Sequence, residues 1–202
     1  MKEERDKWNE KYRSDDFDPP DSPTDVLQNN IGWLPRERAL DIATGTGRNA
    51  LFLSEHGYDV DAIDISGVAL DEAREKARER GVDVNLIKAD VDEYVFPEGE
   101  YDLIVVSFYY NMDRFPDIKE ALSEGGVLVY EHHLRSSDPV ERGPKDNRYR
   151  FRSNDLLHAC LDLTVLHYSE RTVTENERRS AIVSLIARRS SGGEQSYPDR
   201  SA

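Results

Sequence analysis

"DIATGTGRNA", residues 41–50, joins an apolar run to an apolar helical pattern. The run is "RALDIA" (38–43), and the pattern that follows is "NALFLSEHG" (49–57). Gly45 and Gly47 stand between them, one residue apart. Glycines between a strand and a helix let a ligand approach the backbone closely. The stretch therefore predicts a strand, a ligand-binding turn and a helix.

The same alternation of strand and helix continues along the chain. Apolar runs of strand length are followed by segments with apolar residues at helical spacing, and Ser66 and Gly81 are typical start and stop signals of one such helix. Strands separated by helices predict right-handed crossovers and a parallel sheet covered on both faces. The expected helices are 47–56, 66–80 and 115–122, and the expected strands are 38–43, 58–65, 82–89, 101–108 and 125–134.

The end of the chain departs from this pattern. After a helix that we expect Ser153 to cap, two strands follow at 163–172 and 179–189. Only residues 173–178 separate them, which is too short for a crossover helix, so the two strands must pair as an antiparallel hairpin. The sequence thus predicts an α/β fold: a doubly wound, mostly parallel seven-stranded sheet with a C-terminal antiparallel hairpin.

We expect three regions along the chain. Residues 1–34 form an N-terminal helical lid, in which helix 3–12 carries Trp8 and Tyr12, residues 14–23 form a Pro- and Asp-rich loop, and Ser22 caps a second helix. Residues 35–189 form the ligand-binding domain. Residues 190–202, "SSGGEQSYPDRSA", are predicted to be a disordered tail.

Composition limits the classes of function. The 202 residues suffice for one α/β domain, and the formal net charge of −14 disfavours nucleic acid as a partner. The N-terminus lacks an apolar signal-peptide core and no apolar stretch has membrane-spanning length, so we expect a cytoplasmic protein without membrane association. Cys160, the single cysteine, is expected to pack in the interior. Twenty Arg against seven Lys in an acidic chain favours a salt-rich cytoplasm over an ordinary acidic enzyme.

Polar residues end each predicted parallel strand, where ligands bind in such sheets. The glycine loop with Asp64 fits a dinucleotide site, but Asp41 would repel the pyrophosphate of NAD. A carboxylate there suits the cationic amino-acid end and sulfonium of S-adenosylmethionine instead. Asp90 supplies a polar acceptor for an adenine amine. The sequence favours S-adenosylmethionine; an NAD(P)-dependent oxidoreductase and a non-catalytic cofactor-binding protein remain as alternatives.

"ALDIATGTGRNALFLSEHGYDVDAIDIS" (39–66) resembles the class I S-adenosylmethionine-dependent methyltransferases, in particular the small-molecule branch of tellurite-resistance and thiopurine methyltransferase-like proteins. "WNEKY" (8–12) and "YRFRSNDLLHACLDLTVLHYSE" (149–170) also resemble that branch. The resemblance implies the Rossmann-like methyltransferase fold. Ala43 departs from the general motif, which has its first glycine there, although this branch often has alanine.

The resemblance also implies a set of cofactor-binding residues. Arg48 and Asn49 open the helix after the glycine loop, and contact with the cofactor and simple solvation are equally open for both. The resemblance places Asp41, Ala43, Thr44, Gly45 and Gly47 along the methionine part of the cofactor, Asp64 at both ribose hydroxyls, and Ile65 on the adenine. It places Asp90 and Val91 at the adenine edge, and Ser107 and Phe108 near the amino-acid part and the transferred methyl group.

The sequence contains fewer signals for the residues that bind the methyl acceptor than for those that bind the cofactor. The tip of the fourth parallel strand reads "SFYYN" (107–111) and lacks the proline pair of many amino-group methyltransferases that act on DNA or protein glutamine. We therefore expect a small-molecule acceptor, no nucleic acid, no metal, and a monomer or homodimer. The candidate catalytic residues are His132, His133 and Tyr109, and the candidate substrate and lid residues are Trp8, Tyr12, Tyr110 and Asn111.

The sequence alone leaves two questions about the acceptor-binding residues open. Adjacent strand residues point to opposite faces, so at most one of His132 and His133 should face the site. The basic excess in residues 135–152 could attract an anionic substrate, but a solvated loop balanced by its own acidic residues is the favoured interpretation. With no fixed acid–base pair in the sequence, we expect methyl transfer chiefly by proximity.

Overall fold

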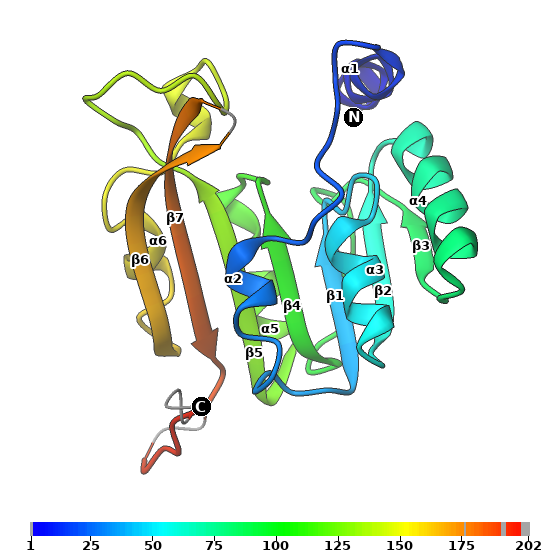
Figure 1. Cartoon of the computed structure of the whole chain (residues 1–202). Coiled ribbons are helices and arrows are strands. Elements are labelled where there is room, and N and C mark those ends of the chain that lie inside the picture. The colour runs from blue at the N-terminus through cyan, green and yellow to red at the C-terminus, as the bar shows by residue number, and fades with distance from the viewer. Residues whose placement is uncertain (1, 176, 191–192, 199–202) are drawn as a thin grey trace.

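A seven-stranded sheet with strand order β3-β2-β1-β4-β5-β7-β6 forms the centre of the molecule (Figure 1). The computed structural model describes residues 2–175, 177–190 and 193–198. β7 runs antiparallel to both of its neighbours, and the other pairs are parallel. The predicted fold is confirmed. The strands are β1 (Arg38–Ile42), β2 (Asp59–Asp64), β3 (Asn85–Lys88), β4 (Tyr101–Ser107), β5 (Leu122–His133), β6 (Thr164–Glu175) and β7 (Arg178–Arg188).

Helices cover both faces of the sheet, as Figure 1 shows. Leu27 of α2 and Leu53 of α3 pack with one face of the strands, and Ile118 of α5 and Leu156 of α6 pack with the other. β4 is buried on both faces, which explains its nearly continuous apolar sequence. The helices are α1 (Lys2–Arg13), α2 (Asp25–Gln28), α3 (Arg48–Glu55), α4 (Gly67–Arg80), α5 (Phe115–Glu120) and α6 (Asp155–Ala159), with short 3₁₀ turns η1 (Met112–Arg114) and η2 (Asn147–Tyr149).

Two predicted helix caps are wrong. α2 begins after Thr24, because the backbone N–H of Thr24 donates to Asn49 Oδ1 at 3.0 Å and fixes the chain there instead of at Ser22. α6 begins after Asn154, since the hydroxyl of Ser153 donates to Glu170 at 2.7 Å and is not used as a cap. In contrast, Ser66 caps α4 as predicted, accepting from the N–H of Ala69 at 3.2 Å.

The connection from β3 to β4 contains no helix in the described chain. Tyr94 and Phe96 lie in this connection with ring centroids 5.0 Å apart, and both pack against the core on the α5 side. The two aromatic rings take the covering role that a crossover helix has elsewhere. Residues 173–178 were expected to connect the last two strands. β6 and β7 include most of them, so the hairpin connection is shorter than predicted.

Other expectations concern the chain ends and Cys160. Cys160 is fully buried among apolar side chains, where burial raises the pKa of its thiol to about 12, so its packing role is confirmed. Residues 191–192 and 199–202 of the predicted tail lie outside the described residues. Arg188 donates to Gln195 at 3.0 Å and to the carbonyl of Ser196 at 2.6 Å within the described part.

Candidate active site

The glycine loop follows β1 at the point where strand order reverses between β1 and β4. Gly47 has a φ of 85° and forms the N-cap of α3, and Gly45 has a φ of 58°. Ala43 also has a positive φ, 56°, in the region that favours glycine. This conformation explains physically why glycine is the general choice at the position that Ala43 occupies.

Asp41 lies buried beneath this loop, with 1% of its surface exposed. Its Oδ2 accepts from the Thr44 hydroxyl at 2.5 Å, while Oδ1 is buried without a hydrogen-bond partner in the described chain. Burial raises the pKa of Asp41 to about 7, although the Thr44 hydrogen bond, the charge of Arg48 and the nearby backbone N–H of Ala50 oppose the rise. A buried carboxylate oxygen that lacks a partner is suited to a cationic ligand group.

Asp64, at the end of β2, ties two loops together. Its Oδ2 accepts from the N–H of Gly45 and its Oδ1 from the N–H of Ser66, both at 2.8 Å. Burial raises the pKa of Asp64, and these backbone hydrogen bonds oppose the rise. Each carboxylate oxygen can accept a second hydrogen bond. Asp64 can therefore orient the glycine loop and still accept from ligand hydroxyls.

Helix α1 lies over this edge of the sheet (Figure 1). A Cβ on Gly45 would lie 2.6 Å from the hydroxyl oxygen of Tyr12, so this ring reaches the glycine loop itself. Asn9, which the sequence analysis missed, accepts from the Ser66 hydroxyl at 2.9 Å and connects α1 to the start of α4. Trp8 packs 6.1 Å from Tyr12 between ring centroids. That α1 acts as a lid stays a prediction.

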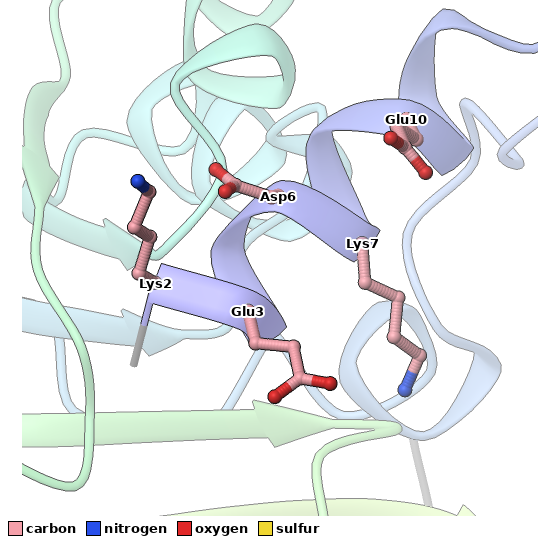
Figure 2. A pocket seen from close by; sticks show the side chains of 5 residues that line it. All are labelled: Lys2, Glu3, Asp6, Lys7 and Glu10. Carbon is pink, nitrogen blue, oxygen red and sulfur yellow. The ribbon is translucent and has the colours of Figure 1, made fainter.

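The outer surface of α1 carries charged side chains, in contrast to the aromatic residues Trp8 and Tyr12. Figure 2 shows five side chains of α1 that line a hollow, three of them acidic and two basic. Lys7, one of the five, also pairs with Glu4 at 3.3 Å. Such pairs on an exposed helix contribute little energy and mark a solvated face. None of the predicted site residues lines this hollow. Its lining residues are Lys2, Glu3, Asp6, Lys7 and Glu10.

Residues after β2 and β3 form the side of the site predicted for adenine. Ile65 is half-buried, and Val91 is buried in the core on the α5 side. Asp90 follows β3 closely, and its Oδ1 accepts from the N–H of Asp92 at 3.1 Å. The topology thus places Ile65, Asp90 and Val91 at the same edge of the sheet as Asp64.

The tip of β4 is held by neighbours on both sides. The Ser107 hydroxyl accepts from the Asn49 amide at 3.0 Å, and the Phe108 N–H donates to the carbonyl of Glu131 at 2.9 Å. Tyr109 points to the β3–β4 connection, where its hydroxyl donates to Asp92 at 2.9 Å. Burial, together with Asp92, raises the pKa of Tyr109, so this phenol stays protonated at neutral pH.

Tyr110 and Asn111, the remaining predicted substrate residues of this tip, point in different directions. Tyr110 stacks on His132, with ring centroids 5.7 Å apart, and meets Phe151 edge-on at 4.8 Å. Asn111 donates to Asp92 at 2.6 Å, beside Tyr109. The structure therefore places Tyr110 beside His132 and directs Tyr109 and Asn111 to the β3–β4 connection.

His132 and His133 end β5 with their ring centroids 5.7 Å apart, and the Phe108 ring lies near both, at 6.3 and 4.8 Å. That at most one of them faces the site stays a prediction. His132, 1% exposed, is directed to the α5 face, where its Nε2 donates to the carbonyl of Tyr149 at 3.0 Å. His133 packs on Phe108 with ring centroids 4.8 Å apart. The Nδ1 atoms of both rings are buried without a hydrogen-bond partner in the described chain.

Burial makes both histidines weak bases. It lowers the pKa of His132 to about 4 and, with the neighbouring His132 and Arg150, that of His133 to about 3. Both imidazoles are therefore neutral near pH 7. A neutral imidazole can orient a donor group, but a conjugate-acid pKa this low makes it a poor general base.

The basic segment after β5 is organised by Arg150, which is 5% exposed. Its guanidinium donates to three backbone carbonyls, those of Pro144 at 2.7 Å, Arg142 at 2.8 Å and Leu134 at 3.1 Å. Arg135 likewise donates to the carbonyls of Asn147 and Arg150, at 2.9 and 3.2 Å. These two basic residues hold the loop together through its backbone, so Arg150 departs from the expected solvated loop, whereas Arg148 pairs with Asp146 at 2.8 Å as that interpretation expects.

Among the residues that the structure describes, no group of three or more His, Cys, Asp or Glu side chains could hold a metal ion. Within the same residues, no helix combines the length and apolar character needed to cross a bilayer.

Comparison with known proteins adds independent observations. Residues 39–126 match a family described as a methyltransferase domain. A demethylmenaquinone methyltransferase of Thermus thermophilus is 39% identical over 102 residues, which are 46% of this chain and 46% of that protein. A probable S-adenosyl-L-methionine-dependent methyltransferase, TehB of Haemophilus influenzae, is 29% identical over 140 residues, covering 66% of this chain and 48% of that protein. The chain thus spans about half the length of these curated relatives.

Solved structures share the fold over most of the chain. The crystal structure of TehB from Haemophilus influenzae has a TM-score of 0.71 at 22% identity, and the match covers 92% of this chain and 66% of that one. A structure described by the conversion of a disulfide bond into a thioacetal group during echinomycin biosynthesis has a TM-score of 0.72 at 20% identity, covering 92% and 91% of the two chains.

Proposed function

We propose that this chain, which belongs to the class I S-adenosylmethionine-dependent methyltransferases, transfers the methyl group of S-adenosylmethionine to a small-molecule acceptor. The observation that carries the proposal is the buried Asp41 carboxylate beneath a glycine loop that Asp64 holds in place. The same carboxylate argues against a pyrophosphate at this loop. We further propose a cytoplasmic protein, monomeric or homodimeric, without a nucleic-acid partner.

The residues at the strand ends fit the cofactor. Asp41 Oδ1, buried and without a hydrogen-bond partner in the described chain, suits the ammonium of the amino-acid part. Asp64 keeps accepting capacity for ribose hydroxyls, and Asp90 lies at the same edge for the adenine amine. When bound, S-adenosylmethionine supplies a methyl group that its sulfonium already activates. The chain's own task is then to position the acceptor and to exclude water.

The histidines support a mechanism that depends on proximity. His132 and His133 are neutral at physiological pH and have weakly basic nitrogens, because burial lowers both pKa values. Tyr109 is protonated and donates to Asp92. An acceptor such as a thiolate needs no proton removed by the protein. We therefore propose a soft or readily ionised acceptor, held at the tips of β4 and β5.

The cofactor affinity should depend on pH through Asp41. In the free protein this carboxyl has a raised pKa of about 7, so it becomes protonated as the pH falls below 7. A cationic ligand group binds the ionised form. The dissociation constant of S-adenosylhomocysteine, measured by calorimetry between pH 5.5 and 8, is expected to be constant above pH 7 and to rise up to about tenfold per pH unit below it.

Asp41→Asn is the matched control for this pH dependence. The amide cannot ionise, so its dissociation constant should be larger than that of the wild type at pH 8 and nearly independent of pH. An equally steep pH dependence in Asp41→Asn would assign the titration to another group and would remove Asp41 from the proposed cofactor site.

An acceptor screen that follows S-adenosylhomocysteine release tests the activity itself. With an accepted substrate, His132→Ala and His133→Ala should lower kcat by well under the roughly 10²–10⁴-fold typical of general base catalysis. Between pH 6 and 8, kcat should follow the ionised fraction of the acceptor and show no additional titration from either histidine. If either variant still binds cofactor and acceptor but loses about a thousandfold in kcat, proximity does not suffice and that histidine is the general base.

A further inference from the structure

The side chain of Asn9 joins α1 to the first turn of α4. Its Oδ1 accepts from the hydroxyl of Ser66 at 2.9 Å and from the backbone N–H of Val68 at 3.4 Å. Because that N–H can only donate, the oxygen of the Asn9 amide must be the atom that faces α4. Ser66 is the N-cap of this helix and accepts from the N–H of Ala69. Asn9 therefore adds a second cap to the start of α4, from a different helix.

Ser66 connects Asn9 to the carboxylate that is proposed to bind the ribose. The backbone N–H of Ser66 donates to Oδ1 of Asp64 at 2.8 Å, and Ser66 is fully buried, so its neighbours determine its position. Oδ2 of Asp64 accepts in the same way from the N–H of Gly45, also at 2.8 Å. Backbone groups thus orient both oxygens of the carboxylate, and one of these groups belongs to the residue that Asn9 holds.

Helix α1 also reaches the other loop that Asp64 holds. Tyr12 lies three residues after Asn9 on the same face of the helix, and its hydroxyl oxygen would lie 2.6 Å from a Cβ on Gly45. None of the residues of α1, Lys2–Arg13, all of which the structure describes, is buried. Such a helix has no core of its own, so its position depends on side-chain contacts such as those of Asn9 and Tyr12. Through these two residues, α1 contacts both loops that Asp64 connects.

We propose that Asn9 is a positioning residue for the cofactor: by holding Ser66 it orients the Asp64 carboxylate toward the ribose hydroxyls, and it thereby makes cofactor affinity depend on α1. The inference rests on the proposed function and adds to that site a residue that acts through another. Without the Asn9 oxygen, the Ser66 hydroxyl and the Val68 N–H lose an acceptor, and the turn between β2 and α4 can shift. Asp64 then keeps its charge, but its hydrogen bonds to the ribose lose their favourable geometry.

A double-mutant cycle between Asn9 and Asp64 tests this coupling. Calorimetry at pH 8 gives the dissociation constant of S-adenosylhomocysteine for the wild type, Asn9→Ala, Asp64→Ala and the double variant. We expect Asn9→Ala alone to weaken binding by roughly threefold to tenfold, the range of one neutral hydrogen bond. In the Asp64→Ala background the same substitution should have no further effect, because the group that Asn9 positions is absent. A contribution of Asn9 to folding alone would instead give the same loss in both backgrounds.

Asn9→Asp and Glu10→Ala are the matched controls. Aspartate keeps an acceptor for the Ser66 hydroxyl, and the start of a helix favours a negative charge, so Asn9→Asp should bind S-adenosylhomocysteine more tightly than Asn9→Ala. Glu10, the next residue of α1, lines the outer hollow, and Glu10→Ala should bind like the wild type. Wild-type affinity in Asn9→Ala, an additive loss in the double variant, or Asn9→Asp as weak as Asn9→Ala would overturn the inference. Absence of S-adenosylhomocysteine binding in the wild type would instead refute the proposed function.

Discussion

Asp64→Ala is expected to weaken S-adenosylhomocysteine binding by roughly thirtyfold or more, equivalent to about 2 kcal/mol. The carboxylate is proposed to accept from both ribose hydroxyls, and hydrogen bonds to charged groups are the stronger ones. The same side chain accepts from the N–H groups of Gly45 and Ser66, so its removal also releases the glycine loop. Calorimetry at pH 8 measures the effect without interference from the titration of Asp41.

Asp61→Asn is the control for this prediction. Asp61 is also a buried carboxylate of β2, but it accepts from Tyr101 at 2.8 Å and from Asn85 at 2.6 Å, away from the glycine loop. Its substitution should lower the unfolding temperature and leave the dissociation constant of S-adenosylhomocysteine nearly unchanged. If Asp64→Ala binds as tightly as the wild type, Asp64 does not contact the cofactor.

The second large effect concerns stability. Arg150→Met is expected to lower the free energy of unfolding by about 3 kcal/mol or more, because three backbone carbonyls lose a charged donor in a largely buried setting. Methionine retains much of the apolar stem, so the loss would come from the guanidinium. Urea unfolding followed by circular dichroism gives the difference in free energy.

Arg150→Lys separates the geometry of the donor from its charge. A lysine ammonium is a compact charge that lacks the planar guanidinium fork, so it should recover only part of the lost stability. Wild-type stability in Arg150→Met would show that the three contacts contribute nothing net. Full recovery by lysine would show that charge alone holds the loop.

The order of strands and helices was predictable because its signals are local. Apolar runs, Ser66 and Gly81 each act within one element, and the short connection between the last two strands forces them to pair. The failures arose where a distant partner decides a boundary. Ser22 and Ser153 stand where a helix cap is expected. However, Asn49 accepts from the backbone N–H of Thr24, two residues after Ser22, and Glu170 accepts from the hydroxyl of Ser153.

The sequence predicted the strand ends at which the candidate site lies, but not how its side chains contact one another. Parallel strands present their carboxyl ends at one edge, so Asp41 and Asp64 could be placed together from topology alone. The contacts of Phe108 with Arg48 and His133 could not, because the left-handed conformation of Phe108 depends on its tertiary neighbours. Asn9 had a usable signal, since it lies three residues before Tyr12 and shares its helix face.

Calorimetric titration of the wild-type protein with S-adenosylhomocysteine and, separately, with NADH tests the central claim most directly. A buried carboxylate beneath the glycine loop accommodates a cationic amino-acid end and repels a pyrophosphate. The account predicts that S-adenosylhomocysteine binds with one site per chain and that NADH gives no measurable binding. Tight binding of NADH without binding of S-adenosylhomocysteine would contradict it.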